Sequence, residues 1–201
     1  NVAGQLLLTG SANVLLLPTL ADSLAGRMAI QRLHPLSQSE IRQNRSGFLQ
    51  ALLRDGFRQI SCPRLGDELA ERITGGGYPA ALRRSSSSRR QAWYADYIES
   101  IVQRDVQDLR RIRALDDLPR LVAAAATQTG HLFNVSELAA PFQVSRTTIA
   151  DYVTLLERLF LIEQLSPWYT NRLSRMVKTP KLHLGDVGIA CSLLGVDASD
   201  L

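Results

Sequence analysis

Cysteine is scarce in this chain, and the phosphate-cradling loop of P-loop proteins is missing. Cys62 and Cys191 are the two cysteines among 201 residues, and neither stands in a C-x-x-C pair. Isolated cysteines are more often small core hydrophobes than a disulfide or metal pair. The pattern G-x-x-x-x-G-K-S/T occurs nowhere, so no P-loop can cradle a triphosphate here. The three histidines are scattered as well, and we predict no metal site.

Long apolar runs are also lacking. The longest candidate, Leu121–Ala126, is short and rich in alanine, whereas a membrane span needs roughly 18 or more apolar residues. The first residues carry no signal-peptide pattern. With 45% hydrophobic and 21% charged residues, the composition is ordinary for a soluble globular protein. We therefore expect a cytoplasmic protein that does not associate with a membrane and forms one large domain or two small ones.

Positive charge is in excess and unevenly distributed. The formal net charge is +4, and no acidic residue occurs between Ser166 and Gly185. Clustered positive charge permits nucleic-acid binding, although solvated basic loops are at least as common. The basic residues of this acid-free stretch are Arg172, Arg175, Lys178 and Lys181.

Two short strands and a capped helix are expected in the first third of the chain. The apolar run Leu6–Thr9 predicts a buried strand, and the alternating pattern of Ala29–Leu33 predicts a second one. Ser37 and Glu40 have the spacing of a capping box, in which each side chain binds the other residue's backbone N–H. A helix around 48–53 should follow.

Helices dominate the middle of the chain. Asp67–Ile73 should form a short helix that ends at the three glycines Gly75–Gly77, since glycine readily adopts the positive φ of a sharp stop. A phosphate-binding loop is the weaker interpretation of these glycines, because neither a strand nor a lysine accompanies them. Helical spacing of apolar residues then predicts one long helix over Arg89–Arg113 and another over Leu118–Thr129.

A helix-turn-helix pattern follows. Asn134 precedes a short helix, and Ser145 caps a second one with apolar residues at helical spacing from Ile149 to Leu159. Phe160-Leu161-Ile162 is a β-branched and aromatic run, and it predicts a strand that continues to Leu165. A short helix, a tight turn, a longer amphipathic helix and a strand are typical of a winged helix-turn-helix.

DNA readers of this class present the first residues of the second helix to base edges. In this chain those residues are Ser145, Arg146, Thr147 and Thr148, which suit phosphates and bases. The wing would span Ser166–Lys181, where the acid-free basic stretch lies, and duplex DNA is the expected partner. A winged helix used for packing or protein contact is the alternative.

Five short motifs, in this order, resemble a group of prokaryotic AAA-type P-loop ATPases with a C-terminal domain of unknown function. Together they cover almost the whole chain. The motifs are Leu8-Thr9-Gly10-Ser11-Ala12-Asn13, Ser23-Leu24-Ala25-Gly26-Arg27, Gly76-Gly77-Tyr78-Pro79, Gln103-Arg104-Asp105-Val106 and Lys181-Leu182-His183-Leu184-Gly185-Asp186.

The resemblance implies catalytic roles in an intact parent protein, of which this chain would be a C-terminal fragment. Thr9, Ser11 and Asn13 match a sensor position that orients the water attacking ATP, and which of them faces the nucleotide stays open. Arg27 is similar to an arginine that stabilises transition-state charge, with a structural ion pair as the alternative. ATP and Mg²⁺ would be cofactors of the parent only, which could form a homo-oligomer through its ATPase domain.

The resemblance also implies an order of domains. The fold class is mainly α with a small β component, as a remnant of a P-loop α/β core over 1–36, a helical linker over 37–130, and the winged helix-turn-helix over 131–185. Residues 186–201 would begin an endonuclease-like segment, with Asp186 at its first acidic position. One carboxylate cannot hold a two-metal centre, so we expect a binding module without catalysis of its own. A stand-alone winged-helix transcription regulator and a protein–protein scaffold are the alternatives.

Overall fold

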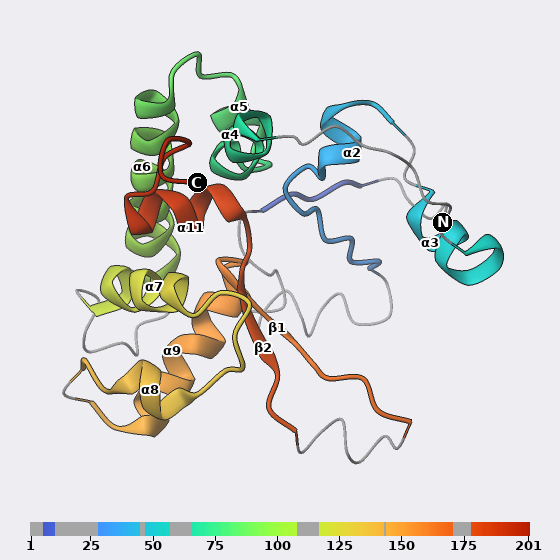
Figure 1. Cartoon of the computed structure of the whole chain (residues 1–201). Coiled ribbons are helices and arrows are strands. Elements are labelled where there is room, and N and C mark those ends of the chain that lie inside the picture. Colours follow the sequence, from blue (N-terminus) through green and yellow to red (C-terminus); the bar gives the residue numbers. More distant parts are fainter. Residues whose placement is uncertain are drawn as a thin grey trace. The chain divides into compact units, whose positions relative to one another are not determined.

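The computed structural model describes residues 6–10, 28–44, 47–56, 66–107, 117–142, 144–170 and 178–201. This part of the chain is mainly helical with one two-stranded antiparallel sheet (Figure 1). The chain forms two compact units, one of residues 1–33 with 97–185 and the other of residues 34–96 with 186–201. The second unit thus combines two stretches that are separated in the sequence by residues 97–185.

Neither of the two strands predicted near the start is present, and both predictions were wrong. Residues 6–10 and 28–34 have no regular secondary structure. Leu6 and Leu7 are 88% and 90% exposed, so the first apolar run is not buried. An apolar or alternating run becomes a strand only where a neighbouring strand and a packed face stabilise it. The described residues provide neither around these two segments.

The unit formed by residues 34–96 and 186–201 is built from short helices, and several of its predicted features are confirmed. Ser37 and Glu40 form the predicted capping box at the start of a four-residue helix, and the long helix predicted from Arg89 begins at Ser87. The helix expected over 67–73 is also present and continues to Gly75. The helices are α2 (Gln38–Ile41), α3 (Phe48–Gln50), the π-helix η2 (Ala51–Asp55), α4 (Asp67–Gly75), α5 (Pro79–Leu82), the first half of α6 (Ser87–Gln107) and α11 (Val187–Leu194).

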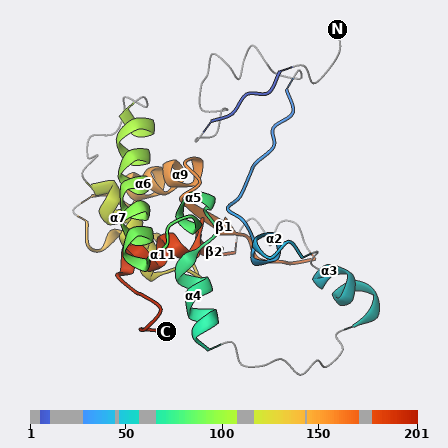
Figure 2. The same cartoon turned by 90° about the horizontal axis from the view of Figure 1, so that it is seen from above.

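Burial of small and aromatic side chains holds this unit together. Helix α11 packs against α4 (Figure 2). Tyr94 of α6 is 1% exposed, and Ala81 and Ile189 are fully buried. Cys191 is a buried free thiol in α11, as predicted for a small core hydrophobe; Cys62 lies outside the described residues. Burial of such side chains contributes about 25 cal/mol for each Å² of apolar surface removed from water.

The other unit contains the predicted pair of helices and a hairpin. Its elements are the second half of α6, α7 (Asp117–Thr127), α8 (Val135–Ala139), α9 (Arg146–Arg158), β1 (Ile162–Leu165) and β2 (Lys181–Leu184). The apolar stripe predicted for the second helix is buried, with Ile149 and Leu156 at 0% exposure. α9 contacts α8 and β1, while α7 contacts α8 and β2. The helices therefore cover one face of the hairpin and form its core.

The hairpin has a third strand-like neighbour. β1 and β2 are antiparallel, with Ile162 opposite Leu184 and Leu165 opposite Lys181. The segment 130–133 runs along the other edge of β2: the Leu182 N–H donates to the His131 carbonyl at 3.0 Å, and an isolated bridge joins Leu132 to Lys181. The chain between α7 and α8 is thus fixed to the sheet, and α8 starts directly from it.

The link between α9 and β1 contains an unusual residue. Phe160 has φ 59°, in the left-handed region that favours glycine. Its N–H donates to the Glu157 carbonyl and the Leu161 N–H donates to the Leu156 carbonyl, both at 3.0 Å, which closes the helix end. The Arg32 guanidinium lies 4.5 Å from the Phe160 ring centre and 3.3 Å from a Glu163 carboxylate oxygen. These contacts offset part of the strain, which costs about 1–2 kcal/mol.

Candidate nucleic-acid interface

The first turn of α9 brings together the four residues that the helix-turn-helix pattern singled out. Ser145 is the N-cap, and its Oγ accepts the Thr148 N–H at 3.1 Å. The same hydroxyl is 2.6 Å from Thr147 Oγ1 and 2.8 Å from Thr148 Oγ1, so it hydrogen-bonds to both threonine hydroxyls. These three hydroxyl groups stabilise the helix start. The Arg146 guanidinium takes no part in these hydrogen bonds.

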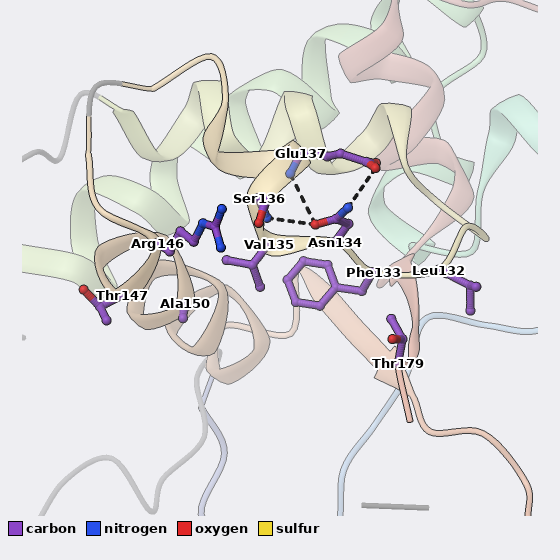
Figure 3. Close-up of a pocket in the computed structure, with 10 residues that line it drawn as sticks. All are labelled: Leu132, Phe133, Asn134, Val135, Ser136, Glu137, Arg146, Thr147, Ala150 and Thr179. Carbon is purple, nitrogen blue, oxygen red and sulfur yellow. Dashed lines mark hydrogen bonds between the residues drawn. The ribbon is translucent and has the colours of Figure 1, made fainter. Parts of the chain in front are cut away.

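A groove lies beside this helix start (Figure 3). Its volume is about 740 Å³, and it is bounded by the start of α8, the first two turns of α9, the edge segment and the residues before β2. The Phe133 ring and the Val135 side chain lie between Arg146 on one side and Thr179 on the other (Figure 3). The lining residues are Leu132, Phe133, Asn134, Val135, Ser136, Glu137, Arg146, Thr147, Ala150 and Thr179. The groove therefore combines an apolar surface with one cation and several hydrogen-bonding groups.

The polar end of this groove is held rigid by the cap of α8. Asn134 Oδ1 accepts the N–H groups of Ser136 at 3.0 Å and Glu137 at 3.4 Å. The Asn134 amide also donates to Glu137 Oε1 at 2.8 Å. The Glu137 carboxylate is engaged by this amide, whereas the Arg146 side chain has neither a hydrogen bond nor an ion pair within the described part of the chain.

The solvent side of α9 forms one continuous stripe. Buried apolar residues occupy the opposite side of the helix, so the exposed positions recur every three or four residues. We call this set the exposed stripe. It consists of Arg146, Thr147, Ala150, Asp151, Thr154 and Arg158.

The end of the hairpin carries the described part of the predicted wing. Lys178 and Lys181 are exposed, and Lys181 lies between Leu132 and Leu165 on the neighbouring strands. Trp168 is 81% exposed. The other two wing cations of the sequence prediction, Arg172 and Arg175, lie outside the described residues.

Sequence reasoning missed two parts of this surface. Phe133 and Thr179 line the groove but lie in connecting segments far apart in the chain, and no local pattern links them. Asp151 lies on the exposed stripe. It could have been predicted as exposed, because it stands at a position of the helix that the apolar pattern leaves to solvent. Of the remaining candidates, Thr9 is an exposed residue outside any strand, and Ser11, Asn13 and Arg27 lie outside the described residues.

Asp186 is a structural residue. It is 8% exposed, and it caps α11 by accepting the N–H groups of Gly188 at 2.9 Å and Ile189 at 3.3 Å. Its other oxygen accepts the Gly77 N–H at 2.7 Å. Burial raises the pKa of Asp186 above its ordinary value, and these hydrogen bonds oppose that shift. Among the described residues, no group of three His, Cys, Asp or Glu residues could hold a metal ion.

Comparison with known proteins identifies two mycobacterial relatives. The chain is 27% identical over 194 residues to the uncharacterized protein Rv2008c of Mycobacterium tuberculosis and to the uncharacterized protein Mb2031c of Mycobacterium bovis. The matched region is 96% of this chain and 38% of each relative, so the chain spans about two fifths of their length. No solved structure matches. Within the described residues, no helix is long and apolar enough to cross a membrane.

The resemblance to AAA-type P-loop ATPases is overturned by these comparisons. The matching family model covers residues 66–200 and is described as a domain of unknown function, and neither relative's name refers to an ATPase. The physical reason is visible at Leu6–Thr9, where the motif required a buried strand and the residues are exposed without one. The sensor and arginine roles of Thr9, Ser11, Asn13 and Arg27 depended on that resemblance and are withdrawn. The chain belongs to the family described as Domain of unknown function (DUF8612).

Proposed function

We propose that residues 117–184 form a winged helix-turn-helix module that binds duplex DNA. The order of elements supports this: a helix, an edge segment on the sheet, the short helix α8, the longer helix α9, and an antiparallel hairpin. In winged helices the second helix of the pair enters the major groove, and the hairpin loop contacts the flanking backbone. In the order of the chain, α9 corresponds to the second helix of the pair, and residues 166–180 correspond to the hairpin loop.

One observation carries the proposal: the first turn of α9 is exposed, capped and bordered by an open groove. Arg146 and Thr147 are solvent-accessible there and line the groove together with the start of α8. The Ser145 cap holds this turn in helical geometry before any ligand arrives. A pre-organised cation at a helix N-terminus suits a DNA phosphate or a guanine edge, both of which offer acceptors.

Charge at the hairpin supports the same partner. Lys178 and Lys181 are exposed, and no acidic residue occurs in the sequence between Ser166 and Gly185. Each lysine or arginine that neutralises a phosphate releases condensed counterions, so affinity falls as salt rises. For a DNA-binding surface of this kind, we therefore expect the logarithm of the affinity to fall measurably with the logarithm of the salt concentration.

A protein partner is the second candidate, and the apolar part of the groove favours it. Phe133 and Val135 are half-buried there, and Leu132 at its edge is 63% exposed. Such a surface could accept apolar side chains of a short peptide. Binding of that kind would depend little on salt, which separates it from DNA binding.

The test is fluorescence anisotropy with a labelled random-sequence duplex over a series of salt concentrations, using the whole chain. We expect Lys178→Ala with Lys181→Ala to weaken binding to all duplexes alike and to reduce the logarithmic salt slope by about 0.9 for each phosphate that is no longer neutralised. The charge-matched control is Arg54→Ala with Arg83→Ala, two exposed cations of the other unit, and it should leave the slope unchanged.

Two results would reject the proposal. One is a wild-type protein that does not bind duplex even at low salt. The other is an equal effect of the lysine pair and the arginine control, which would mean that only net charge matters. If the chain binds a peptide but no duplex, and Phe133→Ala abolishes the peptide binding, the protein partner is favoured.

A further inference from the structure

Asp151 stands out on the exposed stripe because its carboxylate has no role in the fold. It lies one turn after Thr147 on α9 and is exposed. Within the described part of the chain, the carboxylate forms neither a hydrogen bond nor an ion pair. Its neighbours differ: the Thr154 hydroxyl donates to the Ala150 carbonyl at 2.9 Å, and the Thr147 hydroxyl is bound to Ser145.

A free carboxylate at this position is costly for a surface that faces phosphates. Like charges repel, and each phosphate near Asp151 would weaken non-specific binding. Base edges in the major groove present donors as well as acceptors. A carboxylate offers acceptors alone, and its most suitable partner there is the N4 amino group of cytosine.

We propose that Asp151 is a specificity-determining residue that accepts a hydrogen bond from cytosine N4 in the major groove. This inference rests on the proposed binding of duplex DNA by α9. The position agrees with the chemistry, because residues within the first two turns of such a helix reach base edges. Arg146, five residues earlier, would contribute the opposite charge at the helix start, so the first two turns of α9 present one cation and one anion.

Glu157 provides a matched control on the same helix. It carries the same charge but is half-buried and lies six residues after Asp151, about 9 Å further along the helix axis and near the C-terminal end of α9. Asp151→Asn and Glu157→Gln each remove one negative charge and keep the side-chain shape. Asp151 is exposed and has no partner within the described residues, so its amide variant should fold normally, and circular dichroism checks this.

The experiment selects duplexes from a randomised pool with the wild-type chain, Asp151→Asn and Glu157→Gln, and then measures the affinity of each for the selected duplex. A second duplex replaces the selected cytosine–guanine pair with thymine–adenine. We expect wild type and Glu157→Gln to prefer the cytosine duplex by about 5- to 150-fold, the range for one good base contact. Asp151→Asn should lose most of that preference, because its amide can donate as well as accept.

The outcomes separate the two proposals. If wild type binds duplex without a cytosine preference, or if Asp151→Asn keeps the preference, the role of Asp151 is overturned while DNA binding stands. If both amide variants raise affinity equally for all duplexes, Asp151 only repels phosphates, and the inference is again overturned. If none of the three proteins binds duplex at low salt, the proposed function itself fails.

Discussion

The Tyr94 hydroxyl lies 3.0 Å from Asp186 Oδ1 and 3.0 Å from the Gly75 carbonyl oxygen, so its single proton is directed to two buried acceptors. Burial, together with the negative charge of Asp186, raises the pKa of Tyr94 above its ordinary value of 10.0. Tyr94 is therefore a donor at neutral pH. This contact joins α6 to the start of α11 within one unit and fixes the end of α4.

Replacing Asp186 with Asn should destabilise this unit. The two carboxylate oxygens accept from four donors, the Tyr94 hydroxyl and the N–H groups of Gly77, Gly188 and Ile189. An amide must turn its NH₂ group toward at least one of these donors, which leaves a buried donor unsatisfied. We expect a decrease of about 1–3 kcal/mol in the free energy of unfolding at pH 7.

Urea denaturation and amide hydrogen exchange at Gly77 and Gly188 would measure this decrease. Asp96→Asn is the control, since Asp96 belongs to the same unit and is exposed. Exchange rates in Asp186→Asn that match those of the control would contradict the role assigned to Asp186.

The pH dependence of stability should show the raised pKa of Asp186. Burial is its main cause. The folded pKa exceeds the ordinary value of 3.8. At a pH between these two values, the folded protein therefore holds a proton on Asp186 that the unfolded chain has released. The contribution of this group is fully present below 3.8 and is lost as the pH rises through the folded pKa.

A carboxyl-carbon NMR titration of the folded protein measures this pKa directly. Asp186 should titrate above its ordinary value of 3.8. The urea midpoint of wild type should fall relative to that of Asp186→Asn as the pH rises through the folded pKa. Titration of Asp186 below 3.8 would show that its hydrogen bonds outweigh its burial.

Local features of the fold could be predicted from the sequence, whereas contacts between distant segments could not. The capping box at Ser37 and the apolar stripe of α9 follow from spacing within one or two turns, and both are present. The strand predicted at Leu6–Thr9 failed because strand formation depends on a partner elsewhere in the chain. Asp186 and Gly77 are 109 positions apart, and nothing in the sequence around either residue indicates the other.

The same distinction applies to the candidate interface. The cap residue Ser145 and the cation Arg146 were located by the helix-turn-helix pattern, because both belong to one helix start. The groove required Phe133 and Thr179 to meet across the sheet edge, which depends on the pairing of residues 130–133 with β2. Pairing of that kind is set by packing of the whole unit and not by local propensity.

Gly76 should be among the least tolerant positions of its unit. Its φ is 64°, and a Cβ atom there would lie 2.1 Å from the Tyr94 hydroxyl oxygen and 2.3 Å from Asp186 Oδ1. Gly195 is the control for a positive φ without a clash: its φ of 66° and ψ of 26° are left-handed helical, it belongs to the same unit, and a Cβ atom would meet nothing within 4 Å. Gly195→Ala should therefore cost about 1–2 kcal/mol, from the left-handed backbone alone.

Gly76→Ala should cost more than Gly195→Ala for two reasons. Its φ of 64° and ψ of −159° lie in a region that is almost confined to glycine, and the methyl group must displace two buried, hydrogen-bonded side chains, which adds about 1–3 kcal/mol. Urea denaturation of the two variants gives the sum of these two contributions. Hydrogen exchange at Gly188 should accelerate in Gly76→Ala alone, since its N–H depends on the position of the Asp186 carboxylate. Equal losses of stability in both variants would mean that the Tyr94–Asp186 pair yields without cost, and that its hydrogen bonds do not hold the end of α4 against α11.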